Sequence, residues 1–198
     1  MSATSAPFGL RPAFHPSGLD RAQALAGGIV SGYSSNILKG QPVKYDTNGT
    51  IVPAAAGDAF VGAFAGVEFT DTTGRRRVSN YWPASTAYQT GSCVAYFYND
   101  PNIVYEIQAD GTLAQSSIGD EADLSNATAG STTTGLSQAT LSTTLIGANG
   151  VAQMRIVDVA PYPDNAWDDT YVIVRATIAE FQFGQVRTGG ANLTPIAI

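Results

Sequence analysis

Two groups of carboxylates are the side chains in this sequence best suited to chemistry. Asp120, Glu121 and Asp123 form the first group, and Asp164, Asp168 and Asp169 form the second. Several oxygens on one flexible loop can hold a hard cation such as calcium, and paired carboxylates can hydrolyse a glycosidic bond. Neither group has the alternating spacing of an EF-hand loop, and a solvated loop rich in Asp, Asn and Pro is the commoner explanation. We expect no metal and no cofactor, and a hydrolase that uses Asp120 and Asp123, or Asp164 and Asp168, ranks third among our hypotheses.

The single histidine and the single cysteine also argue against an enzyme. His15 lies between Phe14 and Pro16, where the chain is too irregular to hold it rigidly beside a nucleophile. Cys93 excludes an internal disulfide and a multi-cysteine zinc site, and its apolar neighbours predict a buried strand thiol. The specific motifs of phosphate-binding loops, zinc peptidases and dinucleotide-binding folds do not occur. We therefore expect a protein without catalytic activity.

Charge is unevenly distributed along the chain. The sequence has 10 Lys and Arg residues against 16 Asp and Glu residues, which gives a net charge of −6. Residues 99–170 hold ten of the acidic residues and one Arg. Such a segment opposes nucleic-acid binding, which needs a continuous basic surface. Arg75, Arg76 and Arg77 are the exception; they could contact phosphate or an acidic partner, although a solvated loop tip or a protein–protein ion-pair site is the simpler interpretation.

The composition indicates contact with other proteins. Charged residues make up 13% of the chain, half of the usual share of about 25%. Few charges, 21 glycines and many Ser and Thr residues predict a largely neutral surface, as in a protein that works inside an assembly. The first residues lack a basic region before an apolar block, and no apolar run approaches the roughly 20 residues that span a bilayer. We expect no signal peptide and no membrane contact, so that the chain is made in a cytoplasm.

Residues 1–32 are predicted to form an irregular N-terminal arm. Five Pro and Gly residues between positions 7 and 18 prevent a long helix. One short helical turn is expected at residues 20–25. Phe8, Leu10 and Phe14 are too apolar for a free tail, so the arm should pack on a neighbouring chain or on its own body.

Residues 33–183 are predicted to form one all-β domain. Residues 39–54 contain two strand-forming runs on either side of Asn48-Gly49, a dipeptide typical of tight hairpin turns. Residues 103–108 alternate as a half-buried strand does, and residues 170–183 show the strongest strand pattern. Short strands, frequent glycine turns and the lack of a long amphipathic helix predict a β-sandwich or barrel of short antiparallel strands.

Two further segments complete the expected organisation. Residues 125–144 are poor in charge and rich in Thr, which predicts a threonine-lined loop in which Leu136 and Leu141 touch the core. Residues 184–198 are predicted to be a C-terminal extension.

Several short motifs follow one another along residues 8–183. They are Phe8-Gly9-Leu10-Arg11-Pro12, the hairpin from Gly40 to Gly49, the glycine-broken run from Gly57 to Val67, Tyr105 to Asp110, Ile118-Gly119-Asp120, and Pro163-Asp164-Asn165 before a closing β run. In this order they resemble the capsid cement, or head decoration, proteins of tailed bacteriophages. The opening departs in detail from the Gly-Phe-Arg-Pro pattern of that family, and residues 184–198 have no match in it.

The resemblance implies a non-enzymatic, β-rich virion protein, a homotrimer on the outside of an icosahedral phage head. It would bind the major capsid protein and clamp neighbouring subunits against the internal pressure of packed DNA. The residues that we expect at the capsid or intersubunit interface are Phe8, Leu10, Arg11, Phe14, Arg75, Arg76 and Arg77. We expect deletion of residues 2–14 to weaken capsid binding while the β domain stays folded.

The aromatic residues leave a second hypothesis open. Most of them should pack in the core or across strands. Trp82 and Trp167 could instead serve as sugar platforms, which would make the chain a carbohydrate- or receptor-binding β module of a virion fibre.

Overall fold

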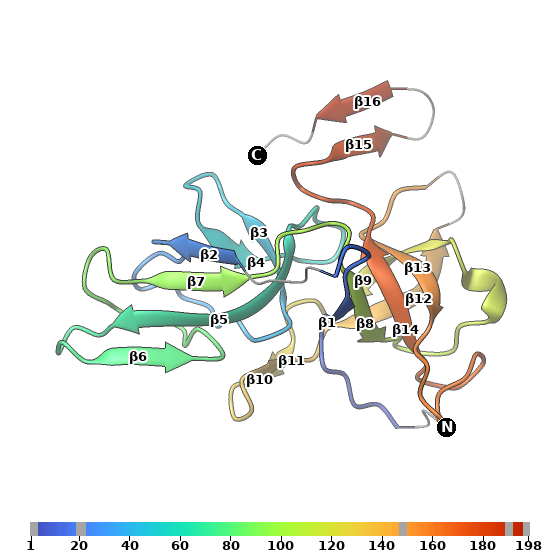
Figure 1. Ribbon diagram of the computed structural model, residues 1–198, viewed down its shortest axis with the longest axis horizontal. Coiled ribbons are helices and arrows are strands. Elements are labelled where there is room, and N and C mark those ends of the chain that lie inside the picture. The colour runs from blue at the N-terminus through green and yellow to red at the C-terminus, as the bar shows by residue number, and fades with distance from the viewer. Residues whose placement is uncertain (1–3, 19–22, 147–149, 189–191, 196–198) are drawn as a thin grey trace.

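The computed structural model describes residues 4–18, 23–146, 150–188 and 192–195. These residues form an all-β protein with a sandwich-like arrangement of sheets and no closed barrel, and one short 3-10 helix, η1 (Gln115–Ser117), is the helical element among them (Figure 1). The predicted fold class is therefore confirmed. No helix in the described part of the chain is long and apolar enough to cross a membrane.

Sheet I contains six antiparallel strands and lies on the right of Figure 1. Its strands, in spatial order, are β1 (Arg11–Phe14), β8 (Val104–Gln108), β14 (Ile173–Ile178), β13 (Met154–Val159), β9 (Glu121–Ser125) and β12 (Thr140–Ile146). The first strand of the chain thus pairs with a strand more than ninety residues later, with Arg11 opposite Glu106.

Sheet II also has six strands and lies on the left of the same view. Its spatial order is β2 (Gln23–Ala26), β7 (Val94–Phe97), β5 (Gly62–Thr70), β3 (Pro42–Tyr45) and β4 (Ile51–Pro53), and β6 (Arg76–Ser79) also pairs with β5. Two small hairpins complete the described fold, namely β10 (Gly130–Ser131) with β11 (Leu136–Ser137), and β15 (Gln185–Thr188) with β16 (Asn192–Pro195).

Each large sheet has its own hydrophobic cluster. The cluster of sheet I includes Tyr105, Ile107 and Val174, and the cluster of sheet II includes Phe64 and Trp82. Within each strand, alternate residues face the same side, so the apolar ones gather on one face of the sheet. Phe181 packs against both clusters, so the two halves share a boundary there.

The strand patterns are confirmed for one strand and corrected for another. In β14 the predicted alternation holds, with Val174, Ala176 and Ile178 buried and the residues between them partly exposed. The strand at residues 104–108 is not half-buried as predicted, because every residue of β8 is buried. Strand β8 lies between β1 and β14, and its outward-facing Glu106 is covered by side chains from other elements, described below.

The N-terminal arm is less irregular than the sequence indicates. Residues 11–14 form β1 at the edge of sheet I, and residues 23–26 form β2 at the edge of sheet II. The helical turn expected at residues 20–25 is corrected to a strand from Gln23 onward, and residues 20–22 lie outside the described part. The prolines are compatible with edge strands, where one side of the backbone needs no partner.

The Asn48-Gly49 turn joins β3 and β4 where the sequence predicts it, but it works differently. Gly49 adopts a φ of +74°, whereas Asn48 keeps a negative φ. The Asp46 carboxylate organises the turn, since it accepts hydrogen bonds from the backbone N–H groups of Asn48 (3.0 Å) and Thr50 (2.9 Å).

The threonine-rich segment 125–144 is corrected from a loop to strands. It contains the β10–β11 hairpin and the first five residues of β12, which pairs with β9. Leu141 is fully buried, as expected, whereas Leu136 is 40% exposed. Thr is a favourable strand residue, so the same composition suits a strand once a partner strand is available.

Candidate functional site

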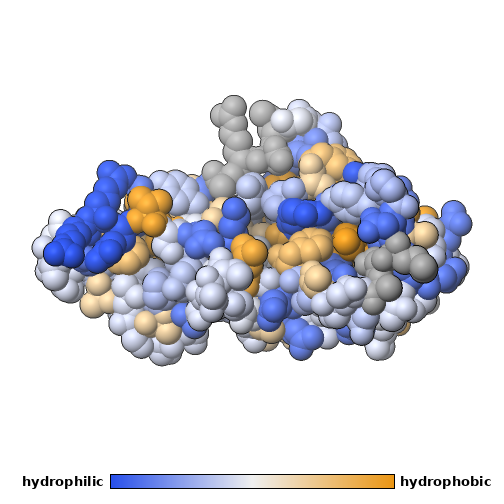
Figure 2. All heavy atoms as spheres, turned by 90° about the horizontal axis from the view of Figure 1, so that it is seen from below, coloured by the Kyte–Doolittle hydropathy of each residue, from blue (hydrophilic) through white to orange (hydrophobic). Residues whose placement is uncertain are grey.

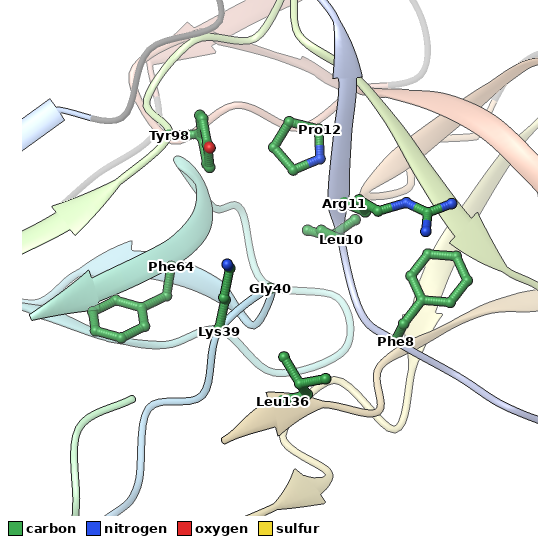
Figure 3. Close-up of a pocket in the computed structure, with 9 residues that line it drawn as sticks. All are labelled: Phe8, Leu10, Arg11, Pro12, Lys39, Gly40, Phe64, Tyr98 and Leu136. Atoms are coloured by element: carbon green, nitrogen blue, oxygen red, sulfur yellow. The ribbon is translucent and has the colours of Figure 1, made fainter. Parts of the chain in front are cut away.

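A pocket of about 320 Å³ lies at the boundary between the N-terminal segment and sheet II (Figure 3). We call it the seam pocket. Its lining residues are Phe8, Leu10, Arg11, Pro12, Lys39, Gly40, Phe64, Tyr98 and Leu136. They come from five separate parts of the chain, so only the folded protein brings them together.

Backbone hydrogen bonds hold four of these segments in place. The N–H of Leu10 donates to the carbonyl of Gly40 (2.8 Å), and the N–H of Gly40 donates to the carbonyl of Phe64 (2.8 Å). On the other side, the N–H of Lys39 donates to the carbonyl of Gly135 (3.0 Å), which brings β11 and its Leu136 to the pocket. The walls are therefore fixed by main-chain contacts as well as by side-chain packing.

Two glycines permit the close approach of the N-terminal segment to the segment at residues 39–40. Gly9 has a φ of +74°, and a Cβ there would lie 2.5 Å from the carbonyl oxygen of Gly40. Gly40 has a φ of +79°, and a Cβ there would lie 3.1 Å from the carbonyl oxygen of Phe8. Both the left-handed conformation and the short distance require glycine.

Arg11 connects the rim of the pocket to a buried carboxylate. Its Nη2 atom lies 2.6 Å from Oε2 of Glu106 and 2.7 Å from the hydroxyl of Tyr162. The Tyr162 hydroxyl donates to the same Glu106 oxygen (2.6 Å). The Phe8 ring lies against the guanidinium, with 4.5 Å between Cζ and the ring centre, a distance at which a cation and an aromatic face attract each other.

The charges around Glu106 keep it ionised. Burial opposes ionisation, but hydrogen bonds from Tyr162 and Arg11 and the charges of Arg11 and Arg175 outweigh it, so the pKa of Glu106 is lowered. The hydrogen bond to Glu106, together with burial, raises the pKa of Tyr162. At neutral pH the cluster is therefore a fixed ion pair with a neutral phenol, which suits positioning and not proton transfer.

Lys39 adds a second cation to the rim. It is exposed, and its ammonium group forms no ion pair with any residue that the structure describes. In Figure 3 its side chain rises on the side of the pocket opposite Phe8 and Arg11. An apolar floor between two cations can accept an apolar side chain that lies next to a carboxylate.

The structure brings some of the predicted interface residues together and separates others. Phe8 and Arg11 line the seam pocket, and the Arg11 side chain is 49% exposed. Leu10 also lines the pocket, but it is only 1% exposed and belongs to the core of sheet I. It packs mainly within its own chain, and its contact with a partner stays a prediction. Phe14 is exposed at the other end of β1, with its ring 5.4 Å from the Arg175 guanidinium carbon.

The Arg75–Arg77 triplet lies far from the seam pocket. It follows the turn between β5 and β6, at the left end of the molecule in Figure 1, and the same end of Figure 2 carries strongly hydrophilic projecting residues. Arg76 pairs with Glu68 (2.7 Å) and Arg77 with Asp71 (3.0 Å). Two of the three arginines therefore already have acidic partners within the chain.

Trp82 cannot serve as a sugar platform, whereas that role for Trp167 stays a prediction. Trp82 is fully buried in the core of sheet II. Trp167 is partly buried and packs against the core of sheet I. A platform needs an open ring face, which Trp82 lacks.

Three of the six carboxylates singled out in the sequence have structural partners. Glu121 is buried in β9 and pairs with Arg155, and Asp123 accepts a hydrogen bond from the backbone of Gln153 (3.2 Å). The Asp169 carboxylate accepts from the N–H of Ala166 (2.9 Å) within its own loop. Across the described part of the chain, no three His, Cys, Asp or Glu residues cluster as metal ligands would.

His15 and Cys93 fit structural roles as well. Nδ1 of His15 lies 2.6 Å from the Ser17 hydroxyl and accepts from the Ser17 N–H (3.0 Å), a local turn contact on an exposed loop. Asp100 approaches the other ring nitrogen at 3.1 Å. Cys93 is buried as predicted, although it lies immediately before β7 and not within the strand, and burial raises the pKa of its thiol.

Sequence reasoning missed Lys39, Glu106 and Tyr162. The polar Glu106 in an otherwise apolar run was a usable signal, because a buried carboxylate needs a cation or hydrogen-bond donors. Nothing in the local sequence around Lys39 or Tyr162 indicates which distant residues they approach.

Comparisons of this chain with protein families, with curated proteins and with solved structures give no match.

Proposed function

We propose that this chain is a cement protein of a tailed-phage head, bound to the outer surface of the major capsid protein, and that the seam pocket is its capsid contact. The observation that carries the proposal is the seam pocket itself. It is built on Phe8 to Pro12, the first of the motifs whose order resembles the head decoration proteins.

The chemistry of the rim fits a protein partner. The Phe8 ring, Leu136 (40% exposed) and the Lys39 ammonium surround an apolar floor. A loop of the capsid protein would insert an apolar side chain into the pocket and bury it on this floor. A carboxylate next to that side chain would form an ion pair with Lys39. Many copies on one shell would reinforce such weak contacts.

The position of the N-terminal segment changes how this must be tested. Because β1 is part of sheet I and Leu10 lies in its core, deletion of residues 2–14 would damage the fold, contrary to our expectation from the sequence. Point variants at the rim are the suitable tool, since Lys39 is exposed and Arg11 half-exposed.

The test uses expanded heads of the phage that encodes this chain. The protein is first removed from these heads, and its binding to them is then measured. Purified protein is added at increasing concentration, and occupancy is measured by sedimentation of the heads and by electron microscopy. Saturable binding at defined lattice positions is expected, together with a higher temperature of head disruption. A protein that never sediments with heads and is absent from mature virions would overturn the proposal.

A homotrimer is part of the same proposal. Light scattering coupled to size-exclusion chromatography should give three times the chain mass of 20.6 kDa, free or on the head. A monomer both in solution and in the reconstructed head would contradict the trimer while leaving head binding intact.

A further inference from the structure

A second pocket lies between the loop at residues 33–38 and the segment that leads into the β10–β11 hairpin, and it shares no lining residue with the seam pocket. Its volume is about 570 Å³, within the range of roughly 300–1,000 Å³ that is usual for small-molecule sites. Hydroxyl and amide side chains dominate its lining, and none of its lining residues is charged. We call it the polar pocket.

Two amide side chains present unused donors to this pocket. The Gln41 side chain is buried, at 1% exposure, and its Oε1 accepts from the N–H of Leu38 at 2.8 Å. Oδ1 of Asn36 accepts from the N–H of Ala84, also at 2.8 Å. Each oxygen is thus committed, which fixes the orientation of each amide.

The side-chain amide nitrogens of Asn36 and Gln41 make no hydrogen bond to the described part of the protein, and both residues line the polar pocket. An amide N–H without a protein partner at the surface of a pocket can donate to an acceptor from outside the protein, either water or an oxygen of a ligand. These two donors are fixed before any ligand arrives.

The remaining lining selects the type of acceptor. Ser34, Thr128 and Thr132 bring hydroxyls that can donate or accept, while Leu38 and Pro53 bring apolar surface. Burial raises the pKa of Tyr33, so its phenol is neutral at physiological pH. With no charge in the lining, an anion such as phosphate or a carboxylate finds no counter-charge there.

We infer that the polar pocket binds a neutral saccharide, a mono- or disaccharide unit of a larger glycan. Its hydroxyl oxygens accept from the amides of Asn36 and Gln41, and its hydroxyl groups exchange hydrogen bonds with the Ser and Thr side chains. The C–H face of a sugar ring lies on the apolar surface of Leu38 and Pro53. This inference concerns a different surface from the seam pocket and does not depend on head binding.

The test is a titration of ¹⁵N-labelled protein followed through its side-chain NH₂ signals. The probes are methyl glycosides of glucose, galactose, mannose and N-acetylglucosamine, with maltose and lactose, and inorganic phosphate as the charged comparison. At least one saccharide is expected to shift the Asn36 and Gln41 signals saturably, with a dissociation constant of about 1 mM, the weak end of the affinity scale. Phosphate is expected to shift neither.

The variant Asn36→Asp separates ligand binding from structure. An aspartate keeps the acceptor for the Ala84 N–H but replaces the donor with an oxygen, so saccharide affinity is expected to fall at least about tenfold. Gln138→Glu, which adds the same charge at an exposed residue outside the pocket lining, is expected to bind as the native chain does. If Asn36→Asp does not fold, Thr128→Val removes one exposed hydroxyl and is expected to weaken binding.

Three results would overturn the inference. They are the absence of any shift at these amides with all six saccharides, an unchanged affinity in both pocket variants, and a stronger response to phosphate than to any sugar.

Discussion

The Arg11 guanidinium lies 2.6 Å from the Glu106 carboxylate, although the two residues are 95 positions apart in the chain. This contact joins β1 to the buried strand β8 and holds the rim of the seam pocket against sheet I. Glu106 also receives the Tyr162 hydroxyl and lies near Arg175. A single carboxylate therefore fixes three elements, and its loss has consequences that can be measured.

Glu106→Gln is expected to lower the free energy of unfolding by about 2 kcal/mol at pH 7, because hydrogen bonds to a charged group are lost. The pKa of Glu106 in the folded state lies below the ordinary value of 4.5. Its contribution is therefore fully present above pH 4.5 and is lost as the pH falls through the lower folded-state pKa. Urea unfolding of both proteins between pH 3 and pH 8 checks this.

The control for this prediction is Asp164→Asn, which removes an exposed carboxylate and is expected to change stability by less than about 0.5 kcal/mol. A Glu106→Gln difference that stays constant down to pH 3 would show that the carboxylate charge does not stabilise the fold.

Gly9→Ala is expected to destabilise the protein by about 3 kcal/mol. Its Cβ would meet the Gly40 carbonyl at 2.5 Å, and alanine is also strained at a φ of +74°. Gly18→Ala is the matched control, because Gly18 has a φ of +77° but nothing within 4 Å of the added Cβ. It is expected to cost about 1 kcal/mol. Equal losses in thermal and urea unfolding would show that the close contact between Gly9 and Gly40 does not add to the cost of the substitution.

Lys39→Glu is expected to weaken binding to depleted heads at least tenfold without changing the melting temperature, because an exposed ammonium without an ion pair is replaced by a carboxylate. Arg75→Glu makes the same charge change at the opposite end of the molecule, where two neighbouring arginines are already paired. Its effect is expected to be smaller. Equal losses in sedimentation assays would indicate a general charge effect and remove the seam pocket as the contact.

Trp167→Phe leaves Trp82 as the only tryptophan, since the chain has two. Trp82 is fully buried, so its fluorescence is expected to be shifted to short wavelength and nearly insensitive to acrylamide. Strong quenching of this variant while it is folded, as shown by circular dichroism, would contradict the burial of Trp82. It would also reopen the fibre-module hypothesis that the buried ring argues against.

Cys93 is expected to resist thiol reagents in the native protein. It is buried, and burial raises the pKa of its thiol, so little thiolate is available for reaction at pH 7. Reaction with a chromogenic disulfide should proceed only at the rate of unfolding, and it should become fast in urea. Rapid labelling without denaturant would show that the segment before β7 opens locally.

The glycine turns, the alternation in β14, the hairpin around Gly49 and the buried Cys93 could all be predicted from the sequence. Each depends on interactions within a few residues, such as the two-residue period of a strand or the φ that a turn requires. The N-terminal segment shows where this reasoning stops. Its prolines and glycines exclude a helix, but they do not show whether the segment stays irregular or joins a sheet as an edge strand.

The seam pocket shows what could not be predicted from the sequence. Phe8 and Arg11 were identified as apolar and charged residues in need of partners, yet their partners come from segments as distant as Glu106 and Leu136. Local patterns therefore determined that this chain is built from short antiparallel strands around apolar faces. The tertiary structure decided which strands pair, that β8 is buried with its carboxylate, and which side chains share a pocket, because those choices depend on packing between residues far apart in the chain.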